Sequence, residues 1–370
     1  MRILIFNWRD PSHPWAGGAE VFLHEVARRW IQQGHAVTWF CARYPGQPPQ
    51  TVLDGIEIIR QGGVYTVYLQ SVRWYLTQCL GHYDVILDSA NGIPFFTPLF
   101  SRIPKVIMVH HIHREVFFYE LPPVMARLGH FLEAVGMPLV YHWDHFLTVS
   151  ESSRNSLMDL GVPKERITVV YNGVDHTVYS PGKKSSRPLI AYMGRLRNYK
   201  SIHVLIQAMP ELLDTIPDLN LVIAGSGEAL GELQRLVEKT GISRQVTFLG
   251  HIPQAEKVRL LQEAQIIVNP SLTEGWGISV IEGNSCGTPV VGSNVCGLRD
   301  SILDGLTGLL FPYGDSHALA GCLKALLLDE KRQRQLSVAA LEWSRCFDWD
   351  RTAADCLEVL EIARRKKTGQ

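Results

Sequence analysis

The chain alternates short apolar runs with longer segments whose apolar residues recur at helical spacing. In the first half, Ala19–Gln32 shows this helical spacing, and Gly34 ends the segment before the next apolar run. Repeated strand-then-helix order predicts a doubly wound parallel sheet, with ligands bound beyond the carboxyl ends of its strands. The strands predicted here are Arg2–Phe6, Ala36–Phe40, Ile56–Ile59, Asp84–Leu87, Lys105–Val109 and His145–Val149.

The pattern breaks at Ser180–Pro188, a cluster of Ser, Pro, Gly, Lys and Arg that we interpret as a linker. The alternation then restarts, which predicts a second doubly wound domain. Its predicted strands are Leu189–Tyr192, Asn220–Ala224, Gln245–Leu249, Ile266–Val268, Thr288–Val291 and Gly308–Phe311, and its predicted helices are Ser201–Asp214, Leu230–Thr240, Ala255–Glu263 and Ser316–Leu328.

These patterns predict an α/β protein of two Rossmann-like domains facing a cleft. A chain of 370 residues exceeds what one hydrophobic core usually sustains. We place the first domain at residues 1–181 and the second at 182–349. Two further helical stretches follow Lys331 and are broken near Phe347–Asp350, where an aspartate is a candidate cap for the last helix. We expect that last helix, about residues 350–370, to pack back on the first domain.

Composition narrows the class of protein. Apolar residues make up 46% of the chain and charged residues 19%, with a net charge of +0, as in a well-buried globular protein. The neutral balance argues against a nucleic-acid partner. The 7 cysteines show no CxxC spacing, which fits reduced thiols and a cytoplasmic location. No segment approaches a membrane span, so any association with a membrane is expected to be peripheral.

The stretch Thr273–Gly292 holds two glutamates, Glu274 and Glu282, eight positions apart. If the second half is helical, this spacing brings Glu282 to the face that passes close to Glu274, so that both carboxylates address one ligand. Gly277 leaves room for a ligand to approach the backbone at the helix start.

Three other glycine-containing turns are candidate sites for phosphate or sugar oxygens. Gly17 and Gly18 follow the first strand and open a helix, where their N–H groups suit an anion, although a flexible loop is the alternative. In the second domain Gly194 and Arg195 follow a strand, and Lys200 arrives as the next helix begins, which suggests a diphosphate clamp. Gly225, between strand and helix, repeats this arrangement more weakly.

Histidines concentrate at His110, His111 and His113, directly after a predicted strand. An extended chain spreads these imidazoles, and no acidic or thiol partner is spaced for a metal site, so we expect no metal. We expect His110, at the strand's carboxyl end, to enter the cleft, with a packed core histidine as the alternative.

Together, these motifs in this order resemble the GT4 family of retaining glycosyltransferases, which have the GT-B fold. The residues that carry the resemblance are Gly17-Gly18, His110, Asn172–Asp175, Gly194-Arg195-Leu196 with Lys200, Val222–Glu228 and the pair Glu274 and Glu282. The sequence departs from the family pattern at Ser201, where glycine is common, and at Trp276, where phenylalanine is common.

The resemblance implies transfer of a sugar from a UDP- or GDP-linked donor to an acceptor with retention at the anomeric carbon, without a metal or other cofactor. It implies that Arg195 and Lys200 hold the diphosphate with backbone help from Gly18, and that His110 contacts the donor sugar near the reacting carbon. It also implies that Glu274 binds sugar hydroxyls and Glu282 the ribose, with the backbone of Gly277, Ile278 and Ser279 against the phosphates and sugar.

Two alternatives stay open at this point: a nucleotide-sugar hydrolase or epimerase, and a GT-B protein that binds nucleotide-sugars without catalysis. The acceptor, whether a sugar, a lipid-linked molecule or another compound, cannot be read from the sequence. The segment Glu115–Leu147 is rich in apolar residues at partly helical spacing. It is either an acceptor-side or membrane-surface face, or an internal helix packed on the sheet.

Overall fold

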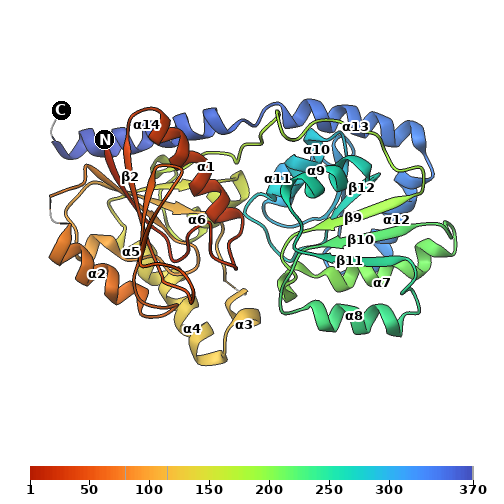
Figure 1. The fold of residues 1–370 in the computed structure, drawn as a ribbon, viewed down its shortest axis with the longest axis horizontal. Helices are drawn as coiled ribbons and strands as arrows, with labels where there is room; N and C mark the ends of the chain where they lie inside the picture. The colour runs from red at the N-terminus through yellow and green to blue at the C-terminus, as the bar shows by residue number, and fades with distance from the viewer. Residues whose placement is uncertain (80, 115, 369–370) are drawn as a thin grey trace. The chain divides into compact units, whose positions relative to one another are not determined.

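The computed structural model describes residues 1–79, 81–114 and 116–368. The chain forms two compact units, the first made of Met1–Asn172 and Trp349–Gln370 and the second of Gly173–Asp348. Each unit contains a mainly parallel sheet with α-helices in its crossover connections, which confirms the predicted class of two doubly wound α/β domains (Figure 1). None of the described helices is both long and apolar enough to cross a bilayer.

In the first unit, the described residues form an eight-stranded sheet of order β3-β4-β2-β1-β5-β6-β7-β8. All neighbouring pairs are parallel except β3 and β4, which form an antiparallel hairpin at one edge. The central strands are buried on both sides, as their continuous apolar sequences predict. The strands are β1 (Arg2–Phe6), β2 (Ala36–Cys41), β3 (Gln50–Leu53), β4 (Ile56–Arg60), β5 (Val85–Ser89), β6 (Lys105–Val109), β7 (His145–Thr148) and β8 (Ile167–Val169).

The helices of the first unit include α14, which follows the whole of the second unit in the sequence. α14 packs along α1 (Figure 1). There Trp30 Nε1 donates to the Ala353 carbonyl at 2.9 Å, and Arg29 pairs with Asp350 at 2.5 Å. The helices are α1 (Gly18–Gln32), α2 (Val67–Gln78), α3 (Val116–Glu120), α4 (Pro123–Phe131), α5 (Met137–Val140), α6 (Glu151–Asp159) and α14 (Trp349–Thr368), with a π-helical turn η2 (Leu132–Gly136) and 3-10 turns η1 (Thr97–Leu99) and η3 (Lys164–Arg166).

The second unit, all of whose residues are described, has a six-stranded parallel sheet of order β11-β10-β9-β12-β13-β14. The strand order reverses between β9 and β12, and this reversal is where doubly wound sheets bind ligands. The strands are β9 (Leu189–Met193), β10 (Asn220–Ala224), β11 (Val246–Gly250), β12 (Ile266–Asn269), β13 (Val290–Ser293) and β14 (Gly308–Phe311). The helices are α7 (Ile202–Leu213), α8 (Leu230–Lys239), α9 (Gln254–Glu263), α10 (Ile278–Ser285), α11 (Leu298–Ser301), α12 (Ser316–Leu327) and α13 (Glu330–Ser344), with a 3-10 turn η4 (Asn198–Lys200).

The boundary between the units lies earlier than the sequence pattern suggests. Contacts place it between Asn172 and Gly173. The predicted linker Ser180–Pro188 belongs to the second unit, where the backbone N–H of Ser185 donates to the Glu263 carbonyl at 2.8 Å. Polar composition predicted a linker, but these residues form an extended segment whose backbone is hydrogen bonded to α9.

Candidate functional site

The switch point of the second sheet brings together the loops that follow β9 and β12. The loop after β9 carries Arg195 and ends in the turn η4, with Lys200 as its last residue. The loop after β12 carries Glu274 and leads into α10. A backbone hydrogen bond of 2.8 Å, from the Leu272 N–H to the Tyr199 carbonyl, ties the two loops together. The sheet order therefore brings Lys200 and Glu274, which the sequence analysis assigned to different parts of one ligand, into a single site.

Lys200 and Glu274 form a mostly buried ion pair. The Lys200 ammonium lies 2.5 Å from Glu274 Oε1, and the two side chains are 13% and 14% exposed. Ser271 Oγ and Asn269 Nδ2 donate to the same carboxylate oxygen at 2.8 and 3.3 Å. All three donors bind Oε1, so the second oxygen of this carboxylate has no protein donor in the described part of the chain.

Both partners of this pair are charged at neutral pH. Burial alone would lower the pKa of Lys200, but the charge and hydrogen bond of Glu274 outweigh it and raise that pKa above its ordinary value. Burial alone would raise the pKa of Glu274, but Lys200 and the donated hydrogen bonds hold it below its ordinary value. The site therefore holds a fixed cation and a fixed anion side by side.

Arg195 adds a second cation to this site. One of its guanidinium nitrogens donates to the Tyr199 hydroxyl at 3.0 Å, and its carbonyl accepts from the Tyr192 hydroxyl at 3.0 Å. Its charge also acts to lower the pKa of Lys200, which shows that the two cations are neighbours. Tyr199, which the sequence analysis did not single out, orients the guanidinium; a tyrosine between two predicted phosphate-binding cations is the signal for it.

Glu282 lies within α10, as the helical interpretation of this stretch predicts, and is buried. The Lys257 ammonium lies 2.6 Å from its carboxylate, and the Glu282 charge contributes to a raised pKa of Tyr179 after burial of that phenol. The two glutamates thus have different lysine partners. Lys257 was missed because it comes from α9, whose approach to α10 only the tertiary fold reveals.

The start of α10 has the form that an anion-binding helix end requires. Gly277 is its N-cap with φ of 86°, a conformation that side chains with Cβ disfavour. The N–H groups of Ile278 and Ser279 lie in the first turn, where no preceding helical carbonyl is available to them. Trp276 next to them is buried and packs on Phe347 at 5.0 Å between ring centroids.

The turns at Gly194 and Gly225 pack against each other, which the prediction of ligand contacts did not anticipate. A Cβ on Gly225 would lie 1.8 Å from the Gly194 carbonyl oxygen, and the Gly225 N–H donates to the Gly250 carbonyl at 2.7 Å. The Gly194 N–H donates to the Ala224 carbonyl at 3.1 Å. The N–H groups of both glycines are thus used within the protein, and the close approach of the turns accounts for glycine at these two positions.

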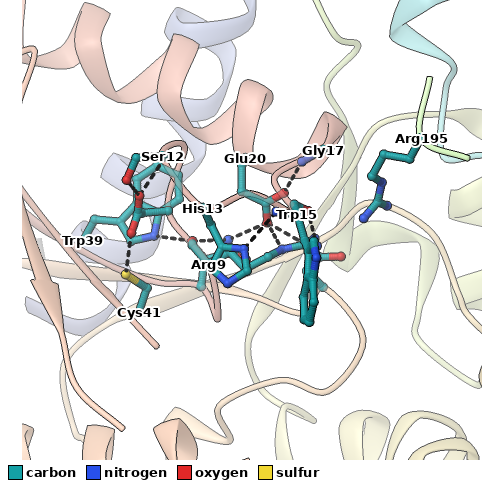
Figure 2. A network of polar contacts seen from close by, with 12 residues as sticks. Arg9, Ser12, His13, Trp15, Gly17, Glu20, Trp39, Cys41 and Arg195 are labelled. Carbon is teal, nitrogen blue, oxygen red and sulfur yellow. Dashed lines mark hydrogen bonds and ion pairs between the residues drawn. The ribbon is translucent and has the colours of Figure 1, made fainter. Parts of the chain in front are cut away.

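In the first unit, Glu20 organises the turn that contains Gly17 and Gly18. Its carboxylate is fully buried and accepts from the Gly17 N–H at 2.7 Å and from Arg9 at 3.1 Å (Figure 2). It also accepts from Asn7 at 3.0 Å. Gly17 is the N-cap of α1 and Glu20 its third residue, the spacing of a capping box. The predicted availability of the Gly17 N–H to a ligand is therefore wrong. Glutamate three residues after the N-cap was the sequence signal for this role.

His110 directly follows β6, as predicted, and its ring is buried. It meets Phe22 edge to face with 5.3 Å between ring centroids, and its buried Nε2 has no hydrogen-bond partner among the residues that the structure describes. Burial lowers the pKa of His110 to about 4, and a nearby His113 adds to this effect while Glu20 opposes it. His110 is therefore a neutral imidazole at physiological pH.

The other histidines of this run make local contacts. His111 and His113 stack with 4.2 Å between ring centroids, and Glu133 accepts from the backbone N–H groups of His113 and Arg114 at 2.7 and 2.8 Å. Over residues 1–79, 81–114 and 116–368, no three His, Cys, Asp or Glu side chains are grouped to hold a metal ion.

Comparison with known proteins places this geometry in a family. Residues 177–343 match the family described as glycosyl transferases group 1, and residues 16–178 match glycosyltransferase family 4. Glycogen synthase of Mycobacterium tuberculosis H37Rv is 27% identical over 400 residues, which cover 99% of this chain and 95% of that protein. The D-inositol 3-phosphate glycosyltransferase of Nocardia farcinica is 34% identical over 231 residues, 58% of this chain and 51% of that protein.

Solved structures share the whole architecture. Sucrose-phosphate synthase from Thermosynechococcus elongatus superposes with a TM-score of 0.83 at 19% identity, with 100% of both chains covered. The Anabaena protein HepE, solved in complex with UDP-glucose, gives a TM-score of 0.78 at 19% identity and covers 98% of this chain and 100% of its own. The fold of the chain is thus GT-B, as predicted. Sequence and structure together identify the chain as a family 4 glycosyltransferase.

Proposed function

We propose that the chain is a retaining, metal-independent glycosyltransferase that moves a sugar from a UDP- or GDP-linked donor to an acceptor. The observation that carries this proposal is the mostly buried pair of Lys200 and Glu274, with Arg195 beside it at the switch point of the sheet. This arrangement offers cations for a diphosphate and a carboxylate oxygen for sugar hydroxyls.

The diphosphate binds to the cationic side of this site. Glu274 keeps the Lys200 ammonium charged before the donor arrives, and the Arg195 guanidinium offers a planar pair of donors to phosphate oxygens. The first-turn N–H groups of Ile278 and Ser279 add the positive end of a helix. The complexes of HepE with UDP and with UDP-glucose support a nucleotide-sugar as the donor class.

The sugar and ribose bind to the two glutamates. The oxygen of Glu274 that has no donor among the described residues accepts hydrogen bonds from hydroxyls of the donor sugar, while Lys200 holds the other oxygen in place. Glu282, fixed by Lys257, accepts from the ribose hydroxyls. The family resemblance assigns neutral His110 a hydrogen bond to the donor sugar, and its Nε2, which has no partner among the described residues, is the atom we assign to it.

In the reaction, the bond from the anomeric carbon to the β-phosphate oxygen breaks and a bond to the acceptor oxygen forms on the same face of the sugar. The acceptor proton passes to an oxygen of the departing diphosphate, so no side chain is required as a nucleophile. Lys200, Arg195 and the α10 helix end stabilise the negative charge that develops on the leaving group. These groups perform the role that a divalent cation would otherwise take.

The test is nucleoside diphosphate release from a panel of UDP- and GDP-sugars, with and without acceptors and with and without EDTA. Candidate acceptors include α-glucans and inositol phosphates. We expect release that depends on the acceptor and is unchanged by EDTA, and an α-linked product from an α-linked donor by NMR. Loss of activity on chelation contradicts metal independence, a β-linked product contradicts retention, and release that never requires an acceptor favours a hydrolase.

A matched pair of arginines tests the phosphate clamp. Arg195→Ala removes a proposed phosphate contact. It is expected to lower kcat/KM by an amount that corresponds to a loss of about 2 to 4 kcal/mol of transition-state stabilisation. Arg197→Ala, two residues away, removes a guanidinium whose partner Glu228 is 54% exposed, and is expected to have little effect. Equal activity in the two variants contradicts the clamp.

A further inference from the structure

The first unit carries an unusual helical segment that runs without interruption through α4, the π-helical turn η2 and α5, residues 123–140. At 1.5 Å per residue it is about 27 Å long. Its inner face is anchored to the unit. Tyr141, just past its end, donates to Asp88 of β5, and Glu133 accepts two backbone N–H groups from residues 113 and 114.

The outer face of this segment is also apolar. Exposed apolar side chains recur every three or four residues along it, which places them in one stripe. A helix that is apolar on all sides is normally buried, yet this stripe faces away from the unit. The inner face of this segment thus packs on the unit, and its outer face is apolar and exposed. The stripe consists of Val124 (77% exposed), Leu128 (48%), Phe131 (56%), Val135 (48%), Leu139 (72%) and Trp143 (82%).

Helix α2 adds a second apolar stripe in the same helical layer. Tyr65, just before α2, is 64% exposed, Leu69 is 75% exposed and Leu76 is 47% exposed. Trp74 of α2 belongs to the same core as Ile86 of β5, and Tyr141 bonds Asp88, two residues further along β5. Residues two apart on a strand point to the same side, so α2 and the α4–α5 segment cover one face of the sheet.

The charges on this layer are positive. Arg73 lies between Leu69 and Leu76 on α2, and Arg127 lies between Val124 and Leu128 on α4, and both are exposed. Among the described residues of 64–78, 91–104 and 116–143, no aspartate or glutamate is exposed. The surface therefore combines apolar stripes with cations inside them and lacks exposed anions in these segments.

We propose that this surface, the outer face of α2 and of the α4–α5 segment, lies on an anionic lipid bilayer. Helices with an apolar face and arginines lie in the plane of the interface, with apolar side chains at the boundary of headgroups and acyl chains and cations on the lipid phosphates. Trp143 and Tyr65 have the amphipathic rings that favour this depth. A second copy of the chain fits less well, because an isologous contact would bring like-charged arginines together.

This inference concerns where the enzyme works and does not depend on its donor or acceptor. The test is co-sedimentation of the full chain, without donor, with vesicles of pure phosphatidylcholine and of equal parts phosphatidylcholine and phosphatidylglycerol. We expect binding to the anionic vesicles that weakens as salt is raised. Replacing Arg73 and Arg127 by glutamine is expected to weaken this binding roughly tenfold, with little effect on neutral vesicles.

Matched substitutions distinguish a specific role of this surface in membrane binding from a general effect of added negative charge. Val124→Asp with Leu139→Asp changes two exposed residues of the stripe, and Val338→Asp with Leu328→Asp makes the same changes at exposed positions of the second unit. The first double variant is expected to lose vesicle binding about tenfold or more, and the second to bind like the wild type. Circular dichroism and thermal melting check that both variants remain folded.

Three results overturn the proposal. The first is a wild-type protein that does not bind anionic vesicles. The second is equal binding by the two double variants. The third is a wild-type dimer in sedimentation velocity that dissociates in the Val124→Asp, Leu139→Asp variant, which assigns the surface to a second copy. Nucleoside diphosphate release in solution is measured in parallel, and because it requires no bilayer, its failure is distinguishable from a failure of membrane binding.

Discussion

Replacing Lys200 by methionine tests the central ion pair, because it keeps the aliphatic stem and removes the charge. Glu274 is then left as a carboxylate that is only 14% exposed and has lost its cation. Glu274→Gln makes the reciprocal change, and the double variant leaves two neutral side chains of similar shape. The three variants form a cycle that isolates the interaction between the two residues.

The magnitude follows from the geometry. Unit charges about 4 Å apart attract by roughly 4 kcal/mol at an effective dielectric constant of about 20, and breaking a buried pair typically costs about 3 to 5 kcal/mol. Glu274 keeps its hydrogen bonds from Ser271 and Asn269, so the cost for Lys200→Met falls at the lower end. We expect about 3 kcal/mol, and a lower Tm by roughly 6 to 12 °C for a unit of this size.

The measurement is calorimetric unfolding of the wild type, the two single variants and the double variant. The second unit unfolds either in a transition of its own or in one transition with the first unit. The double variant is expected to be more stable than the sum of the two single changes, by about 2 kcal/mol or more. UDP is expected to raise the Tm of the wild type and to raise that of Lys200→Met less, because the phosphates have lost a cation.

The pH dependence has a definite sign. The lowered pKa of Glu274 means that its contribution is present above the ordinary value of 4.5 and is lost as pH falls through the folded pKa. The raised pKa of Lys200 means that its contribution is present below 10.5 and is lost as pH rises through the folded pKa. The coupling is therefore expected to be constant from about pH 6 to 9. Strictly additive Tm changes in that range refute the reasoning.

Two further predictions concern single positions. Gly225→Ala is expected to destabilise the second unit by several kcal/mol, because its Cβ would lie 1.8 Å from the Gly194 carbonyl oxygen. Gly231→Ala in α8, where a Cβ would have no atom within 4 Å, is expected to stabilise the unit by about 0.5 to 1 kcal/mol. Thermal melting in which the two variants behave alike contradicts this account. The pKa of the His110 imidazole, measured by NMR, is expected to be about 4. Because the unfolded chain binds this proton near pH 6.5, the folded protein loses stability as pH falls from about 6.5 towards 4. A measured pKa above 6 contradicts burial of the ring.

The strands and the positions of Arg195 and Lys200 between the end of β9 and the start of α7 were accessible to sequence reasoning because they are local. Apolar runs such as Lys105–Val109 and the helix start after Lys200 are determined by neighbouring residues, and the structure has both where expected. The hairpin strand β3 was missed because its alternate residues are exposed and its pairing with β4 lies at a sheet edge. Edge strands give a weak apolar signal.

The partners of charged groups were not accessible, because they depend on tertiary contacts. Lys257 reaches Glu282 from another helix, and Glu20 is held by Arg9 and Asn7 from the loop before α1. The spacing of Glu274 and Glu282 suggested a shared ligand, but it could not reveal that each carboxylate already has its own lysine. Sequence patterns locate such residues on elements, and only the packed fold assigns their partners.

The position of α14 has a consequence for biosynthesis. The second unit is continuous in sequence, so its core needs no segment from outside residues 173–348. The first unit begins earlier but lacks α14, and its buried Ala353, Cys356 and Leu360, until the ribosome has synthesised residues 349–368. Until then the Trp30 indole has no Ala353 carbonyl to bind, and the part of α1 that packs on α14 is uncovered. Completion of the first unit therefore depends on a segment that is translated after the whole of the second unit.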